Sequence, residues 1–299
     1  VTLWVIVTCT FFMMKNLPGT PFDAERFSIM TPQQQERVLE MYGLNDSLPM
    51  QYVKYIKNML KGDLGTSFTY VNQDVSKVIT GRLGPSALIG IQAVLIGLAI
   101  GLILGILAAW KHNSGIDYFT MILAVLGVSV PNFVAAALLQ YYIGLKWGAL
   151  PVGFWTGWNC SVLPSIALSF SATAMVARFM RTEMLDVLDQ DYIVTARAKG
   201  LSQMKVLMRH AVRNSILPVV TILGPIVVNL MTGSLAVENI FSIPGIGSLF
   251  VDCIKANDYP VIMGITIFYA AFYMLIVLLV DLAYSLIDPR IRLAKGKES

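Results

Sequence analysis

The sequence predicts an all-α, polytopic membrane protein with six membrane-spanning helices, and two observations lead to this prediction. First, 56% of the 299 residues are hydrophobic and only 13% are charged, which is about half the charged fraction of a soluble domain. Second, the charged residues are clustered and leave five long uncharged runs. Each run exceeds the roughly 20 residues that a helix needs to cross the hydrocarbon core. The runs are 83–110, 118–145, 147–177, 214–237 and 259–280.

The sixth span is expected at the start of the sequence. Residues 1–14 are uncharged and mostly apolar, but at about 1.5 Å per residue they extend over only about 21 Å. We therefore expect this helix to begin upstream of Val1. The alternative is the apolar part of a signal peptide, which the sequence disfavours because residues 15–18 contain no small-residue cleavage site.

The connection 15–82 is predicted to lie outside the cytoplasm and to be partly helical. Thr31, Pro32 and Gln34 have the spacing of an N-cap, a first-turn proline and a capping box, and this helix is expected to stop at Gly43. A second, amphipathic helix is expected over 49–61, ending at Gly62. Its apolar face is predicted to consist of Tyr52, Ile56 and Met59. The sequence leaves two interpretations open, a solvated cap on the membrane surface and a docking platform for an external partner.

The distribution of Lys and Arg places both termini in the cytoplasm. Short connections on one side of the predicted spans carry Lys111, six cations between 181 and 213, and a basic tail from Arg290. Short connections on the other side carry only Lys146 and Lys255. The connection 15–82 is too long to count, and its eight cations are nearly balanced by seven acidic residues.

The predicted spans offer a packing motif but little chemistry. Gly97, Gly101 and Gly105 recur every four residues, and such a ridge allows another helix to approach closely in lipid. Ionisable residues inside a membrane are functional candidates because burying a charge is costly. Three acidic residues lie near span ends, and we interpret them as end residues with local partners. They are Asp117, Glu238 and Asp281.

No enzymatic motif is found in the sequence. The only histidines are His112 and His210, the three cysteines lack metal or redox spacing, and there is no phosphate-binding loop of the GxxxxGK[ST] type. We therefore expect a chain that is not an enzyme and that binds no metal and no cofactor itself. The net charge of +4 does not indicate nucleic acid as a partner. If ATP drives this protein, another subunit must bind the ATP and its magnesium.

The predicted cytoplasmic segment 181–214 has the pattern of a protein-docking element. Small residues precede Gly200, which can end a helix with a positive φ, and Ser202 can cap a second helix. Lys205, Arg209 and Arg213 form one row on this helix, and its other face is predicted to contain Met204, Leu207, Met208 and Ala211. The alternative is a basic face on anionic lipid headgroups, which explains the cations but not the small residues and the glycine.

Motifs spread over nearly the whole chain resemble ATP-binding-cassette importer permeases. The central one is the run 192–200 (YIVTARAKG), followed by residues 209–214 (RHAVRN) and Leu217-Pro218. More narrowly, the chain is similar to the dipeptide/oligopeptide/nickel branch, and within it to the B-type permease subunit of bacterial oligopeptide importers. Further motifs of the branch are found at 18–22, 82–86, 129–133, 238–247 and 288–292. One departure is Val194-Thr195, where the general importer signature has Glu-Ala, and this puts a contact of that glutamate in doubt.

The resemblance implies a type I importer permease fold in which residues 1–299 form a single transmembrane domain. It also implies that the protein lies in the bacterial cytoplasmic membrane. It implies a second homologous permease subunit, two ATPase subunits and an extracytoplasmic peptide-binding protein as partners, besides the lipid bilayer. The residues implied to couple to the ATPase are Asp191, Tyr192, Thr195, Ala196, Arg197, Ala198, Lys199, Gly200 and Leu201. The candidate gate or pathway residues are Gly127, Ser129, Pro131, Glu238, Pro244 and Gly245.

The function predicted from this resemblance is a permease subunit that moves oligopeptides with ATP hydrolysed by partner subunits. Dipeptide and nickel import are the alternatives within the branch. Peptides are favoured over nickel because both histidines lie on the predicted cytoplasmic side and the spans contain no cluster of metal ligands. Two alternatives from other classes are an ATP-independent secondary transporter or channel, and a membrane scaffold that transports nothing.

Overall fold

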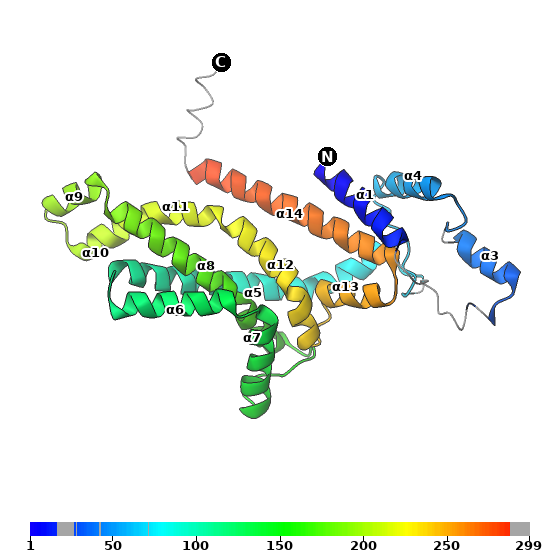
Figure 1. The fold of residues 1–299 in the computed structure, drawn as a ribbon, viewed down its shortest axis with the longest axis horizontal. Helices are drawn as coiled ribbons and strands as arrows, with labels where there is room; N and C mark the ends of the chain where they lie inside the picture. Colours follow the sequence, from blue (N-terminus) through cyan, green and yellow to red (C-terminus); the bar gives the residue numbers. More distant parts are fainter. Residues whose placement is uncertain (17–26, 28, 42, 71, 288–299) are drawn as a thin grey trace, which may run out of the picture. The chain divides into compact units, whose positions relative to one another are not determined.

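The computed structural model describes residues 1–16, 27, 29–41, 43–70 and 72–287, and this part of the chain is mostly helical (Figure 1). It contains one isolated antiparallel bridge, between Thr66 and Asp74. The all-α prediction is therefore confirmed. Two motifs of the resemblance, at 18–22 and 288–292, lie outside the described residues, as does the basic tail.

The chain divides into two compact units. The first combines residues 1–84 with 245–272, and the second combines residues 85–244 with the chain from Tyr273. Two long helices, α5 (Val75–Trp110) and α14 (Tyr259–Ile287), contribute to both units. The expectation of a single domain over 1–299 stays a prediction.

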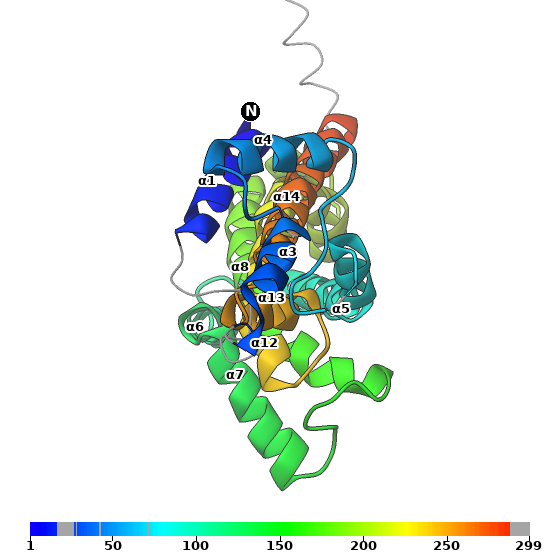
Figure 2. The same cartoon turned by 90° about the vertical axis from the view of Figure 1, so that its right-hand side faces the viewer.

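The first unit contains α1 (Thr2–Lys15), α3 (Pro32–Met41), α4 (Leu48–Met59) and α13 (Ile246–Lys255), together with the first parts of α5 and α14. Its buried core joins the start of α5 to α13 and α14, through Val75, Ile79, Ile246, Leu249, Val261 and Ile262. Figure 2 shows α1 and α4 side by side, and the hydroxyl groups of Thr8 and Tyr52 are 2.7 Å apart between them.

Both helix starts predicted in the connection 15–82 are confirmed. The Thr31 backbone N–H donates to Oε1 of Gln34 over 2.9 Å, and the Gln34 N–H donates back to the Thr31 hydroxyl over 3.3 Å, which is the reciprocal capping box. Gly43 and Gly62 follow the two helices with φ values of +64° and +82°. On α4, Tyr52, Ile56 and Met59 are half-buried, as the amphipathic pattern predicts, and the helix lysines are exposed.

A buried carboxylate that the sequence analysis did not single out ties the end of the connection 15–82 to α14. Asp258 directly precedes α14, and its carboxylate accepts hydrogen bonds from the Ser67 hydroxyl (2.5 Å) and the Thr69 backbone N–H (3.0 Å). It also accepts from the backbone N–H of Val261 over 3.4 Å, inside the first turn of α14. A carboxylate at a helix start satisfies donors that otherwise have no partner, so Asp258 stabilises both the helix start and the loop.

The second unit is organised around α8 (Val162–Leu188). Against α8 pack α6 (Gly115–Ser129), α7 (Asn132–Leu139), α11 (Arg213–Thr221) and α12 (Leu223–Ile240). The remaining elements are the π-helix η1 (Gln140–Lys146), the 3-10 helix η2 (Trp158–Ser161), and α9, α10 and η3, which follow α8. Because helices cover α8 on several sides, many of its side chains are buried, including Leu168, Val176, Met180 and Met184.

The glycine ridge of α5 makes a close helix contact, as the sequence predicts, and the structure shows that its partner is α8. A Cβ atom on Gly97 would lie 2.7 Å from Cβ of Ala172, and one on Gly101 would lie 2.7 Å from Cβ of Val176. A Cβ on Gly105 would lie 2.7 Å from the backbone oxygen of Ala177. Because these distances are shorter than van der Waals contact, only glycine allows the two helices to approach so closely.

Three helical segments are long and apolar enough to cross a membrane, Val75–Trp110, Trp158–Leu188 and Tyr259–Leu282, among the described residues. A fourth span is possible if α6 and the following segment Asn132–Lys146 act as one, although they are bent by 100°. The first apolar segment forms α1, which has only 14 residues. The run 214–237 is divided between α11 and α12 at Ile222. Every predicted apolar run is therefore at least partly helical, and the count of six spans stays a prediction.

The predicted span 147–177 differs from the structure at both ends. Its helical part begins only at Trp158 and continues as α8 to Leu188. Residues before it include Pro151, Gly153 and Gly157, which do not favour a helix. The helix then passes through Arg178, Arg181 and Glu183, so the predicted cytoplasmic segment from 181 starts as a continuation of a membrane-spanning helix.

Candidate coupling segment and pathway elements

The short helix α9 (Asp191–Ala198) ends in the way that the sequence predicts. Gly200 has a φ of +78°. Its backbone N–H donates to the carbonyl oxygen of Arg197 over 3.0 Å, and the N–H of Leu201 reaches back to the carbonyl oxygen of Ala196 over 3.4 Å. These two bonds form a Schellman motif, which depends on the left-handed conformation that glycine adopts at no steric cost.

One face of α9 packs inward. Ile193 and Ala196 are buried and form a small cluster with Val206, against which Val187 and Leu188 pack. Ala196 is one of the residues implied to couple to the ATPase, but it is only 6% exposed. It therefore positions α9 and does not contribute a free surface, while the other eight residues of that set are exposed.

The second helix of the segment is less regular than the sequence predicts. It consists of α10 (Gln203–Val206), the π-helix η3 (Leu207–Val212) and α11. Ser202 stands at its N-cap position, but its side chain makes no capping hydrogen bond. Lys205, Arg209 and Arg213 are all exposed, as predicted.

The predicted apolar face of this second helix is only half right. Leu207 and Ala211 are buried, whereas Met204 and Met208 are 49% and 53% exposed. A π-helix has i→i+5 hydrogen bonds, so the spacing of an α-helix no longer predicts which side chains share a face. As a result, the exposed surface of the segment carries apolar side chains. They are Tyr192, Val194, Leu201, Met204 and Met208.

Side-chain hydrogen bonds hold the coupling segment to the helices on both sides of it. The amide of Asn214 donates to the Tyr192 hydroxyl over 3.1 Å and joins α11 to α9. The Ser215 hydroxyl is 3.2 Å from the carbonyl oxygen of Glu183 and 2.8 Å from that of Ala211, and joins α11 to α8. Figure 1 shows α9 and α10 beyond the end of α8. The helix α9 is therefore attached to α11 by a hydrogen bond and to the end of α8 by apolar packing.

An ion pair closes the same end of the second unit. Arg181 donates from Nε to Oδ1 of Asp117 over 2.5 Å and from a terminal nitrogen to Oδ2 over 2.8 Å. Asp117 is buried at the start of α6 and also accepts from the backbone N–H of Asn113 over 3.0 Å. The interpretation of Asp117 as an end residue with a local partner is confirmed. The bidentate geometry fixes the start of α6 to the C-terminal half of α8.

The candidate pathway residues of the third predicted span form a sharp bend. Ser129 is the last residue of α6, and Pro131 precedes α7, where the chain turns by 100°. A Cβ atom on Gly127 would lie 3.0 Å from Cβ of Ala174 and from the carbonyl oxygen of Phe170, so the helix runs close to α8 just before the bend. Gly127 also lines an apolar cavity of about 650 Å³ between α5, α6, α7 and α8.

Glu238 lies at some distance along the chain from this bend, in α12. Its carboxylate is buried and accepts a hydrogen bond of 2.8 Å from the Ser86 hydroxyl of α5. This confirms that it has a local partner. Pro244 is the last residue of the second unit and Gly245 the first of the first unit, where Gly245 caps α13.

Gln140 links the end of α7 to the turn after α12, and the sequence analysis missed it. Its amide nitrogen donates to the carbonyl oxygen of Ile240 over 2.8 Å and to that of Val152 over 2.6 Å. The backbone N–H of Phe154 also donates to the carbonyl oxygen of Phe241 over 2.9 Å. No sequence signal marks such a residue, because a single glutamine in an apolar helix has many other roles.

Comparison with known proteins decides the family. Residues 101–293 match the family described as "Binding-protein-dependent transport system inner membrane component". The chain belongs to this family. It is therefore a membrane component of a transport system, and its motifs in 192–218 are those of an importer permease.

Curated relatives and solved structures agree with this assignment. The dipeptide transport system permease protein DppB of Lactococcus lactis is 45% identical over 292 residues, which cover 98% of this chain and 95% of the relative. The oligopeptide transport system permease protein OppB of Haemophilus influenzae is 38% identical over 293 residues, with coverage of 97% and 95%. The expected branch is confirmed, and these identities do not favour the oligopeptide permeases over the dipeptide permeases.

The fold is confirmed by a more distant likeness. A chain of the methionine ABC transporter MetNI superposes on this permease with a TM-score of 0.61 at 14% sequence identity, covering 71% of this chain and 96% of that chain. The type I importer permease fold is thus shown for most of the permease. Within the residues that the structure describes, no three His, Cys, Asp or Glu side chains are arranged to hold a metal ion.

Proposed function

We propose that this permease forms half of the translocation path of an ATP-driven importer of peptides. Its relatives in Lactococcus lactis and Haemophilus influenzae are named as dipeptide and oligopeptide permeases and match it over nearly their whole length. In the proposed assembly, a second homologous permease supplies the other half of the path, and an extracytoplasmic binding protein delivers the peptide. Dipeptides and longer peptides are both compatible with these relatives.

The observation that carries the proposal is the geometry of the coupling segment. Its exposed surface combines the apolar side chains of Tyr192, Val194 and Leu201 with the cations Arg197 and Lys199. A surface of this kind suits a groove on another protein that has apolar walls and an acidic rim. Because the sequence contains no phosphate-binding loop, we assign the groove to an ATPase subunit that binds the ATP and magnesium this chain does not bind.

The proposed mechanism follows from the contacts of α9. When two ATPase subunits close on ATP, each moves the α9 helix in its groove. The cluster of Ile193, Ala196 and Val206 and the bond from Asn214 to Tyr192 connect that helix to α8 and α11. The movement therefore reaches the spans, and the bend at Pro131 is the element that we propose as a gate. This assignment requires both termini and the coupling segment to be cytoplasmic.

Uptake of a labelled peptide by the reconstituted complex tests this function. We expect accumulation of a labelled dipeptide or oligopeptide when ATP and the binding protein are both present. We expect no accumulation with a non-hydrolysable ATP analogue. Accumulation that follows an imposed ion gradient without ATP would contradict the proposal and would support a secondary transporter. Uptake of nickel, measured in parallel, distinguishes peptide import from nickel import within the branch.

A further inference from the structure

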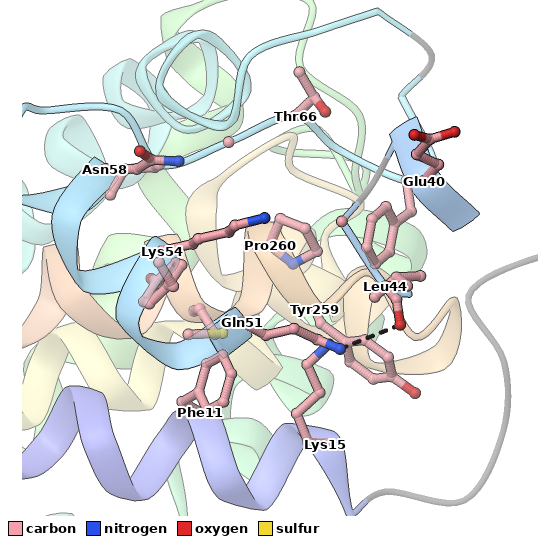
Figure 3. A pocket seen from close by; sticks show the side chains of 16 residues that line it. Phe11, Lys15, Glu40, Leu44, Gln51, Lys54, Asn58, Thr66, Tyr259 and Pro260 are labelled. Carbon is pink, nitrogen blue, oxygen red and sulfur yellow. Dashed lines mark hydrogen bonds between the residues drawn. The ribbon is translucent and has the colours of Figure 1, made fainter. Parts of the chain in front are cut away.

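The first unit contains a pocket of about 350 Å³ that the proposed peptide path does not use (Figure 3). It lies between the end of α1, the helix α4, the loop before α5 and the start of α14. One part of its wall is aromatic and apolar, from Phe11, Tyr259, Pro260 and Met263. Because α14 begins at Tyr259 and is long enough to cross a membrane, the pocket lies near the depth where hydrocarbon meets headgroups.

Two lysines bring positive charge to this pocket. In Figure 3, Lys54 of α4 extends toward Pro260, and Lys15 of α1 extends toward Tyr259 and the end of the Gln51 side chain. Lys54 pairs with Asp46 over 2.6 Å. Lys15 is half-buried, and its ammonium lies over the ring of Phe11, 5.8 Å from the ring centre. No ion pair of Lys15 is found among the described residues. The pocket also contains Glu40, but its carboxylate stands at the edge and points away from both ammonium groups (Figure 3).

The same pocket contains the buried hydroxyl group of Tyr55. The oxygen of Tyr55 is buried, and it is without a hydrogen-bond partner among the described residues. Its ring packs at 5.9 Å from the ring of Phe11. An unpaired buried O–H group costs free energy, so nearly all such groups in proteins have a partner. Within the described residues, the pocket thus contains an ammonium group with no carboxylate partner and a hydroxyl with no acceptor, and both fit an anionic ligand.

We propose that this pocket binds the phosphate group of a membrane phospholipid, held by the Lys15 ammonium and the Tyr55 hydroxyl. Phosphate oxygens accept charge-assisted hydrogen bonds from both kinds of donor, and the aromatic wall packs against the glycerol and the first carbons of the acyl chains. A free phosphate ester offers the same oxygens but has no apolar part to cover that wall. The inference rests on the membrane location of the chain and is independent of what the importer carries.

Lipid retention by the purified, assembled complex tests the site. The probes are phosphatidylglycerol and a phosphate-free glycolipid with the same acyl chains, and bound lipid is counted by native mass spectrometry. We expect the wild-type complex to retain phosphatidylglycerol in preference to the glycolipid. Lys15→Gln removes a charged hydrogen bond, so we expect retention of phosphatidylglycerol to fall about tenfold or more. We expect a smaller fall for Tyr55→Phe. Lys15→Arg is expected to keep most of the phosphatidylglycerol retention.

Lys57→Gln is the matched control, because Lys57 is an exposed lysine of α4 that does not line the pocket. Equal losses for Lys15→Gln and Lys57→Gln would overturn the site, as would equal retention of the two lipids. Soluble glycerol phosphate in a third arm distinguishes a lipid phosphate from a free phosphate ester. Competition by glycerol phosphate at micromolar concentration would overturn the lipid assignment. So would a loss of binding-protein affinity in Lys15→Gln with unchanged lipid retention. If Lys15→Gln does not assemble, Tyr55→Phe and Lys15→Arg decide the question.

Discussion

Gly200 shows how much of the coupling segment depends on one residue. Its φ of +78° and the two hydrogen bonds of the Schellman motif set the direction in which the chain leaves α9. A side chain in this conformation costs roughly 1 kcal/mol or more, and no atom lies within 4 Å of the place where its Cβ would be. A substitution is therefore strained but not excluded by packing inside the chain.

We predict that Gly200→Glu leaves membrane insertion intact and abolishes ATP-dependent peptide uptake. The new carboxylate stands at the centre of the proposed docking surface, where it meets the acidic rim expected on the ATPase. Gly62→Glu is the matched control, because Gly62 also has a positive φ of +82° and open space around its Cβ position. Uptake and co-purification of the ATPase are measured in both variants. Normal uptake by a fully assembled Gly200→Glu complex would refute the docking assignment.

Asp117 and Arg181 show a different use of single residues. The carboxylate is buried, and a buried charge without a partner is strongly destabilising. Two hydrogen bonds from Arg181 and one from the Asn113 backbone satisfy it. The pair therefore contributes mainly to a unique arrangement of α6 and α8 near the coupling segment.

At the scale of elements, the contact between α5 and α8 depends on the glycine ridge. In lipid no hydrophobic driving force holds two helices together, so close van der Waals packing contributes most of the stability of the contact. A Cβ on Gly101 would lie 2.7 Å from Cβ of Val176 and 2.8 Å from the carbonyl oxygen of Thr173. Since the second contact is with backbone, the helices themselves must move apart to accommodate a methyl group.

We predict that Gly101→Ala and Gly90→Ala change stability in opposite directions. Gly101→Ala overpacks the interface, which typically costs about 1–3 kcal/mol. Gly90 lies in the same helix, but nothing lies within 4 Å of its Cβ position, so alanine there gains helix propensity of about 0.5–1 kcal/mol. The thermal midpoint of the purified permease in detergent measures both. An unchanged or higher midpoint for Gly101→Ala would show that this contact is looser than the structure has it.

The helix α8 is the element that sequence periodicity describes least well. An uncharged run predicted a span over 147–177, but the helix of this region is shifted to Trp158–Leu188. The charged residues did not predict the C-terminal end of α8, because the helix continues through Arg181, which pairs with Asp117 of α6. The helix α9 of the proposed coupling segment follows α8 directly, so the end of α8 sets where that segment begins.

At the scale of the whole molecule, cysteine labelling measures the orientation in the membrane, and the native cysteines differ in their accessibility. Cys253 is buried in the core of the first unit. Burial, together with the charges of Asp258 and Asp252, raises the pKa of its thiol to about 12. The folded state therefore binds this proton more tightly than the unfolded state. The contribution of this proton to the free energy of unfolding is therefore fully present below about pH 9, and it is lost as the pH rises through about 12.

We predict that an impermeant maleimide at pH 8 labels Ser47→Cys in intact cells and labels Gln203→Cys only after permeabilisation. Both positions are exposed, one before α4 and one at the start of α10. The background carries Cys9→Ser, because Cys9 is exposed, whereas Cys160 and Cys253 are buried. Cys253 should stay unlabelled at pH 8 and react after denaturation. Labelling of Gln203→Cys in intact cells would reverse the proposed orientation.

The sequence by itself determined the features that depend on local physics. The uncharged runs predict helices in lipid, and the caps at Thr31 and Gly200 involve atoms only three to five residues apart. The glycine ridge predicts a close helix contact, although not its partner. Each of these follows from the geometry of one helix, so a single sequence is enough to predict them.

Only the tertiary structure decided the contacts that join distant parts of the chain. Asp258 binds Ser67 across 191 residues, Gln140 binds the carbonyl oxygen of Ile240 across 100, and Arg181 binds Asp117 across 64. It also left Met204 of α10 and Met208 of the following π-helix exposed, and it placed Lys15 and Tyr55 in one pocket. No periodicity records these pairings, because each depends on how whole helices pack, and many helix arrangements satisfy the same local pattern.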